Sequence, residues 1–217
     1  VIVAADAESV KTACAQMEAA LKNEYRSTDA GVFTAVEQTE ANALPMDAAG
    51  TKNALCLLTC APNGIQAMSH EIGGLVQTSL NLGVLKTEEQ QISASFCVRS
   101  SVETQKQMLV DRLSCLMSVL GGSVEVSGDY PGWEFQKDSA LRDLMAEVYT
   151  EQYDEAPKIE AIHAGVECGM FAGKLPGLDC VSFGPDLTEI HTFRERMHIA
   201  SVQRTWKLVV EILRRMK

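Results

Sequence analysis

The stretch LVQTSLNLGVLKTEEQQISASFCVRS, residues 75–100, decides the fold of this chain. Apolar and polar residues alternate on both sides of the polar segment KTEEQQ, residues 86–91. This period of two is typical of paired strands with one buried face. The pattern places on that face Val76, Thr78, Leu80, Leu82 and Val84 of the first strand and Ile92, Ala94, Phe96 and Val98 of the second. The sequence therefore predicts an antiparallel β-hairpin.

Helical patterns flank this hairpin. Apolar residues recur at helical spacing over residues 9–25 and 102–120, and Gly121 and Gly122 end the second of these helices. A further helix is expected to end at Pro62. Short strands are expected at residues 1–6, 31–38 and 123–130. This order predicts an α+β layer, an antiparallel sheet with helices on one face.

The pattern changes near residue 128, where Pro131 and Gly132 soon interrupt the periodicity. The segments that follow alternate between expected helices (141–148, 167–174 as helix or turn, 202–216) and expected strands (158–164, 178–184). Such alternation is typical of an α/β domain with a largely parallel sheet. We therefore expect two unlike modules, an α+β module at residues 1–128 and a βαβ segment at residues 129–217.

Composition excludes several function classes. A hydrophobic content of 46% is enough to build a core, whereas a net charge of -10 repels phosphate backbones, so we expect no nucleic-acid partner. No apolar run reaches the roughly 18 to 20 residues that span a bilayer, so we expect a cytoplasmic protein with no membrane partner. The seven cysteines form no C-x-x-C pair, which argues against a disulfide framework or a structural zinc site.

The segment IHAGVECG, residues 162–169, contains the first candidate site residues. His163 and Glu167 follow an expected strand, and ligand crevices lie at the carboxyl ends of such strands. In the alternative interpretation His163 only caps the strand, and Glu167 sits in the first turn of a helix, where the dipole favours a carboxylate. Spacing alone leaves both interpretations open.

His191 and His198 lie in a polar loop before the last helix. A neutral imidazole is a common zinc ligand, but two histidines at this spacing form no chelate by themselves, so solvent-exposed loop histidines are the alternative. Arg99 ends the second hairpin strand on the side opposite to its apolar face. It could bind a carboxylate through two parallel hydrogen bonds, or it could simply be solvated.

Several motifs occur in a fixed order along the chain. They are TCAPNG (59–64), CVRSS (97–101), YPGW (130–133), IHAGVECGMF (162–171), VSFGP (181–185) and ERMHIASV (195–202). In order and spacing they resemble the C-terminal half of the aminoacyl-histidine dipeptidases, which are carnosinase-like Xaa-His dipeptidases of metallopeptidase family M20. The resemblance runs over essentially the whole chain.

The resemblance implies a catalytic α/β domain with a binuclear zinc (Zn) site, interrupted by a lid domain that also forms a homodimer. The first module would be most of the lid, and the second would be the returning segment of the catalytic domain. His191 would be a zinc ligand, although its loop reads HTFRE where the family has H-[ST]-P-[DN]-E. Arg99 would hold the C-terminal carboxylate of the dipeptide substrate. His163 and Glu167 would line the substrate site.

The family's other zinc ligands and its general-base glutamate belong to an N-terminal segment with H-x-D and E-E motifs, which these residues do not supply. The chain begins with VIVAAD, an apolar strand without a methionine, so we expect a piece of a longer polypeptide that lacks the N-terminal catalytic half. We expect the parent protein to hydrolyse Xaa-His dipeptides and this chain alone to be inactive. The alternatives are a non-catalytic dimerisation or binding module, an inactive homologue, or another peptidase or aminoacylase of the same family.

Overall fold

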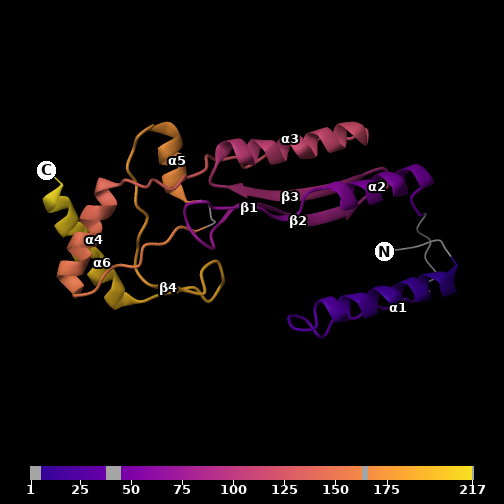
Figure 1. Ribbon diagram of the computed structural model, residues 1–217, viewed down its shortest axis with the longest axis horizontal. Coiled ribbons are helices and arrows are strands. Elements are labelled where there is room, and N and C mark those ends of the chain that lie inside the picture. The colour runs from indigo at the N-terminus through magenta and orange to yellow at the C-terminus, as the bar shows by residue number, and fades with distance from the viewer. Residues whose placement is uncertain (1–5, 38–44, 163–165, 217) are drawn as a thin grey trace. The chain divides into compact units, whose positions relative to one another are not determined.

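The structure is a computed structural model that describes residues 6–37, 45–162 and 166–216. Its helices are α1 (Ala7–Glu24), α2 (Ala48–Cys60), α3 (Glu103–Val119), α4 (Ala140–Tyr153), α5 (Glu167–Lys174) and α6 (Ile199–Arg215), and its strands are β1 (Gly64–Met68), β2 (Val76–Thr87), β3 (Ile92–Ser100), β4 (Leu187–Thr188) and β5 (Arg196–Met197) (Figure 1). The chain divides into two compact units, Val1–Leu55 and Cys56–Lys217. None of the described helices is long and apolar enough to cross a bilayer.

In the first unit, the strand expected at residues 31–38 is not formed over its described part, residues 31–37. The backbone N–H of Thr34 instead donates to the Glu18 carboxylate at 2.8 Å, and the Thr34 hydroxyl donates to the Cys14 carbonyl at 3.1 Å. A strand requires a neighbouring strand to exchange backbone hydrogen bonds with, and the described residues offer this segment none. The segment is therefore held against α1 by side-chain hydrogen bonds.

Glu18 makes this contact sensitive to acid. Its hydrogen bond with Lys22, and then those with Thr34, lower the Glu18 pKa from 4.5 to about 2. Because the pKa in the folded state is depressed, the stabilisation is complete above about pH 4.5 and is lost as the pH falls through about 2. We expect Glu18→Gln to lower the thermal midpoint near neutral pH but not at about pH 2, as measured by far-UV circular dichroism. Glu24→Gln on the same helix is the control, and an equal loss for Glu18→Gln at both pH values would contradict this assignment.

The predicted hairpin is confirmed in the second unit. β2 pairs antiparallel with β3 along nearly its whole length, and β1 pairs antiparallel with the other edge of β2. A bulge lies between Leu82 and Val84, and an extra residue in one strand reverses which side chains face the core. The predicted buried face therefore holds at Leu80, which is 1% exposed, but fails at Val84, which is 46% exposed.

Helix α3 runs along β3 and covers one face of the hairpin (Figure 1). Leu80, Leu109 and Leu113 are buried there, and the half-buried Phe96 and Val98 pack against them. Each fully buried leucine stabilises the fold by about 1.5–3 kcal/mol relative to an exposed one. This core is the one-sided layer that the alternating pattern predicts.

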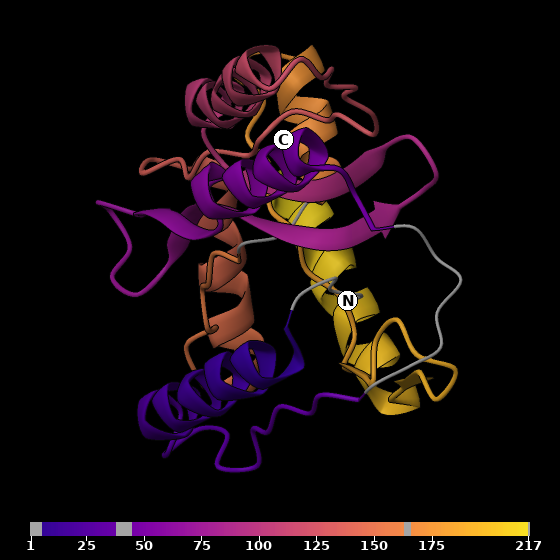
Figure 2. The same cartoon turned by 90° about the vertical axis from the view of Figure 1, so that its right-hand side faces the viewer.

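Helices α4 and α6 lie side by side, as both views show (Figures 1 and 2). Their shared core consists of Met145, Val148, Leu208 and Ile212. Ser139 caps α4 by accepting the N–H of Arg142 at 3.0 Å, and its hydroxyl donates to Asp179 at 2.6 Å. The same carboxylate accepts the N–H of Leu141 at 2.9 Å. Asp179 therefore ties the extended segment 178–184 to the start of α4.

The last helix carries apolar residues at helical spacing, Val202, Trp206, Val209, Leu213 and Met216, and all of this stripe except the half-buried Val209 is exposed. Val202, Trp206 and Leu213 are 37%, 67% and 62% exposed, and the face of α6 that is buried carries Leu208 and Ile212 instead. The described residues place no layer over the stripe. An amphipathic helix with a second, uncovered apolar face is typical of a helix that packs on a further layer.

The strands expected at residues 158–164, 178–184 and 123–130 form no ladder in their described parts, and both sheets of the described chain are antiparallel. The βαβ ladder expected for the second module is therefore not present there. These segments lack a partner strand for their backbone hydrogen bonds, and an isolated strand is not stable. The opening strand lies outside the described residues over positions 1–5. The mixed helix and antiparallel-sheet class is confirmed, and the module boundary near residue 128 stays a prediction.

The segment YPGW passes very closely between β3 and α5. A Cβ on Gly132 would lie 2.4 Å from the carbonyl oxygen of Ser101, and one on Gly169 would lie 2.7 Å from the carbonyl oxygen of Pro131. A Cβ on Gly173 would lie 2.6 Å from the Pro131 ring. Glycine is therefore required at all three positions. We call residues 129–133, which are YPGW and the preceding Asp129, the crossing.

Gly132→Ala should destabilise the chain by about 1–3 kcal/mol, because the added methyl group forces two backbone segments apart. The measurement is the urea unfolding midpoint. Gly73→Ala is the matched control, because a Cβ at Gly73 meets nothing within 4 Å. Equal midpoints for Gly132→Ala and the wild type would contradict the close passage.

Candidate functional site

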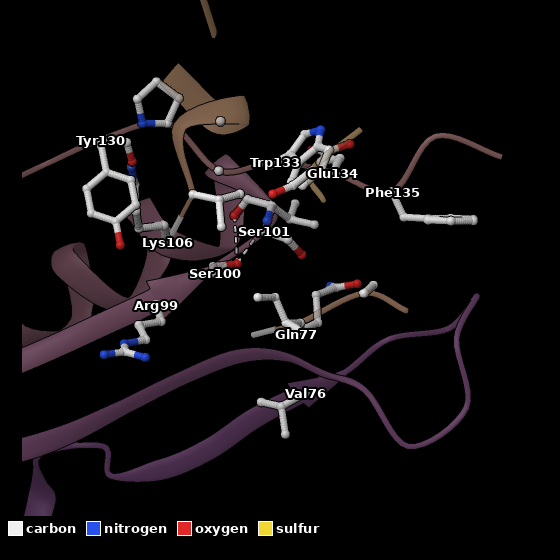
Figure 3. A pocket seen from close by; sticks show the side chains of 18 of the residues that line it. Val76, Gln77, Arg99, Ser100, Ser101, Lys106, Tyr130, Trp133, Glu134 and Phe135 are labelled. Atoms are coloured by element: carbon white, nitrogen blue, oxygen red, sulfur yellow. Dashed lines mark hydrogen bonds between the residues drawn. The ribbon is translucent and has the colours of Figure 1, made fainter. Parts of the chain in front are cut away.

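A cavity of about 2300 Å³ lies between the hairpin and the α4–α6 pair of the second unit. Figure 3 shows the part of it around Arg99 and the crossing. Its wall includes the end of β3, the crossing and parts of α4 and α6. Ligand pockets usually have volumes of about 300–1,000 Å³, so this cavity is larger than a typical small-molecule site. Of the sequence-predicted site residues, Arg99 lines the cavity, whereas Glu167 and His191 do not.

Arg99 lies at the end of β3 with its side chain exposed, on the side of the strand that the alternation predicts. Its hydrogen bond with the Cys97 sulfur, and a smaller contribution from the charge of Tyr130, raise the Arg99 pKa, so the guanidinium is always charged. No described carboxylate forms an ion pair with it. Arg99 is therefore a charged donor group that faces open space.

A buried polar cluster holds the end of β3 beside Arg99. Thr78 is fully buried, and its hydroxyl donates to Gln105 and lies 2.8 Å from the Ser100 hydroxyl. Ser100 Oγ also accepts the N–H of Val102 at 3.0 Å. Because buried polar groups are costly to leave unpaired, this cluster fixes β3 to the start of α3.

Lys106 fixes the crossing to α3. Its amine donates to Asp129 Oδ1 at 2.6 Å and to the carbonyl oxygen of Tyr130 at 2.8 Å, and it pairs with Glu103 at 2.9 Å. Burial opposes the charged form, but the bonds to Asp129 and Glu103 outweigh it and hold the Lys106 pKa above its usual value. No sequence pattern indicated this residue, because its partners meet it only after the chain has folded.

Glu167 is the first residue of α5 and is exposed. A carboxylate is favoured in the first turn of a helix, so its position also fits the alternative in which it only stabilises α5. His163 lies outside the described residues. The substrate-lining role of both residues stays a prediction.

His191 lies in the loop of a small hairpin formed by β4 and β5. Both Glu189, with φ 52°, and His191, with φ 66°, adopt the left-handed conformation that non-glycine residues rarely take. The N–H of His191 donates to the Glu195 carboxylate at 3.0 Å. Such backbone strain costs about 1–3 kcal/mol per residue and is often found at functional sites.

The base of this hairpin is anchored on α6. The carboxylate of Asp186 accepts a hydrogen bond from Arg204 at 2.9 Å, and its N–H donates to Ser201 Oγ at 2.9 Å. The N–H of His198 donates to the Asp186 carbonyl at 3.0 Å. His198 is thus the N-terminal cap of α6, at the base of the hairpin that carries His191.

Comparison with known proteins identifies relatives over nearly the full chain. No protein-family model matches. The chain is 32% identical over 215 residues to the cytosol non-specific dipeptidase of Escherichia coli K12, covering 99% of this chain and 44% of that protein. It matches the crystal structure of an aminoacylhistidine dipeptidase from Vibrio alginolyticus with a TM-score of 0.86 and 31% identity, over 95% of this chain and 42% of the other. The chain is homologous to these dipeptidases.

The resemblance predicted from the motifs is therefore confirmed, and the chain spans less than half the length of the dipeptidases it matches. A third match, to the aminopeptidase PepT of Bacillus cereus, has a TM-score of 0.55 and 21% identity over 75% of this chain and 44% of the other, and shows a shared fold alone. These likenesses do not assign roles to individual side chains.

The described residues of this dipeptidase homologue bring together no set of metal ligands. No three His, Cys, Asp or Glu side chains within the described ranges lie close enough to bind one ion. Structural and catalytic zinc sites take at least three protein ligands. His191 could supply one ligand, and the others would have to come from beyond the described part of the chain.

His191→Asn should raise the stability of the chain by about 0.5–1 kcal/mol, because asparagine adopts the left-handed conformation with less strain than histidine. The measurement is the urea midpoint without added metal. The control is His70→Asn, because His70 is a loop histidine outside the left-handed region, and it should leave the midpoint unchanged. A lower midpoint for His191→Asn would show that the histidine is not strained.

Proposed function

We propose that this chain is part of a metal-dependent dipeptidase of family M20 that hydrolyses Xaa-His dipeptides. The observation that carries the proposal is the homology over 99% of the chain to a protein named as a cytosolic dipeptidase. Because the chain spans 44% of that relative, the activity is proposed for a polypeptide that contains the remaining part, and this chain alone should be inactive.

Arg99 would bind the C-terminal carboxylate of the dipeptide. A guanidinium matches a carboxylate with two parallel hydrogen bonds, and this one lines the cavity without a described acidic partner. His163 and Glu167 would line another part of the substrate site. The structural support for the role of Glu167 is its position at the start of α5, on the helix that packs against the crossing.

His191 would supply one ligand of a binuclear zinc site. Zinc lowers the pKa of a bound water and polarises a carbonyl, which is the chemistry that peptide hydrolysis requires. The strained backbone at His191 supports this assignment, because strain destabilises the fold and is often found where a residue has a function. The remaining ligands and the general base would come from the part of the dipeptidase that these residues do not include.

The uncovered stripe of α6 would pack on that same part. Its residues, with Trp206 at their centre, are exposed, and the segments at 158–162 and 178–184 of the same unit lack strand partners among the described residues. A sheet supplied by the rest of the catalytic domain would cover the stripe and pair with the extended segments. We further propose a cytoplasmic protein that forms a homodimer through the hairpin module, as the resemblance implies.

The test compares the full-length product of the gene with this chain for zinc content and for hydrolysis of an Xaa-His dipeptide. We expect zinc and hydrolysis only in the longer protein. There, His191→Ala should lose zinc while His70→Ala retains it. Arg99→Gln should raise KM by about tenfold to a hundredfold, since it leaves the substrate carboxylate without its charged partner, and Arg26→Gln should not. A full-length protein with neither zinc nor hydrolysis would favour the alternative, a non-catalytic dimerisation module.

A further inference from the structure

Tyr130 lies beside Arg99 at the edge of the cavity. Both residues line the cavity, and the Tyr130 side chain is 44% exposed. In Figure 3 the hydroxyl of Tyr130 points toward the end of β3 that carries Arg99. The two groups are also close enough to interact electrostatically. A phenol and a guanidinium therefore face the same space.

The backbone of Tyr130 is held firmly, but its hydroxyl is not engaged. Lys106 donates to the Tyr130 carbonyl at 2.8 Å, and Gly132 leaves no room for movement against Ser101. Within the described chain, no hydrogen bond uses the Tyr130 hydroxyl. A rigidly placed donor without a partner is suited to a ligand, because little entropy is lost when the ligand binds.

Arg99 also lacks the oxygen acceptors that the other described cations along the cavity have. Each of the others already bonds to oxygen acceptors: Lys106 to Asp129, Glu103 and a carbonyl, Arg142 to the carbonyls of Gln136 and Lys137, Lys158 to Glu160, and Arg204 to Asp186. The three N–H donors of Lys106 match its three acceptors, so its amine has none left for a ligand. Among the described cations that line the cavity, Arg99 is therefore the one without an oxygen acceptor, and the Tyr130 hydroxyl lies beside it.

We propose that Tyr130 is a second residue of the carboxylate subsite, where its hydroxyl donates a hydrogen bond to the carboxylate that Arg99 binds. The ligand class is the free carboxylate of a short peptide, which accepts through two oxygens and can take bonds from both groups at once. The inference rests on the proposed function in assigning Arg99 to a substrate carboxylate. It adds a specificity-determining residue, since the resemblance includes YPGW but gives Tyr130 no role there.

The test measures binding of N-acetylhistidine to this chain by isothermal titration calorimetry, with the carboxamide of the same compound as the comparison probe. We expect the carboxylate to bind and the carboxamide to bind at least tenfold more weakly. Tyr130→Phe should weaken carboxylate binding about tenfold, because one hydrogen bond to a charged group is lost, and should leave carboxamide binding unchanged. Tyr25→Phe, in the first unit, is the matched control.

The outcomes separate this inference from the proposed function. If Tyr130→Phe binds the carboxylate as the wild type does, Tyr130 is not in the subsite, and Arg99 stands alone. Absence of carboxylate binding by the wild type overturns the subsite as a whole. Hydrolysis by the full-length protein is measured separately, so carboxylate binding without hydrolysis would retain the subsite and reject the dipeptidase.

Discussion

The contact of Pro131 and Gly132 with β3 on one side and α5 on the other is the constraint on which the second unit depends. Gly132 and Gly169 allow backbone to meet backbone there, Gly173 makes room for the Pro131 ring, and a side chain at any of the three would separate the segments. Lys106 then closes the contact by binding Asp129 and the Tyr130 carbonyl. Because close-packed segments are not continuously deformable, this contact determines where the end of β3 and the side chain of Tyr130 can lie.

Local patterns predicted the elements whose partners are near in sequence. The hairpin and α3 follow from alternation and helical spacing, because each element finds its buried face within the same stretch of chain. The bulge before Val84 could not be predicted, since Gly83 is compatible with a regular strand as well as with a bulge. β1 was missed because it follows directly on the turn residues that end α2 and has only five residues.

The strands at residues 158–164 and 178–184 and the stripe on α6 differ from prediction for one shared reason. Side-chain pattern shows which surface an element is suited to bury, but burial and pairing require a partner. The described residues supply no such layer, so the strands stay unpaired and Trp206 stays exposed. The patterns are therefore informative about an assembly larger than these residues, which agrees with relatives of more than twice this length.

Site residues were predictable to the extent that their position depends on local geometry. Strand parity placed Arg99 on the open side of β3, whereas Tyr130 comes beside it only through the path of the crossing, which Lys106 holds and helical or strand periodicity does not encode. Arg99 belongs to the hairpin and Tyr130 to the crossing, so a carboxylate bound to both would join two parts of the second unit. Such a ligand binds tightly only in the arrangement that brings both donors within reach. Substrate binding would then stabilise the same junction that the three glycines and Lys106 build.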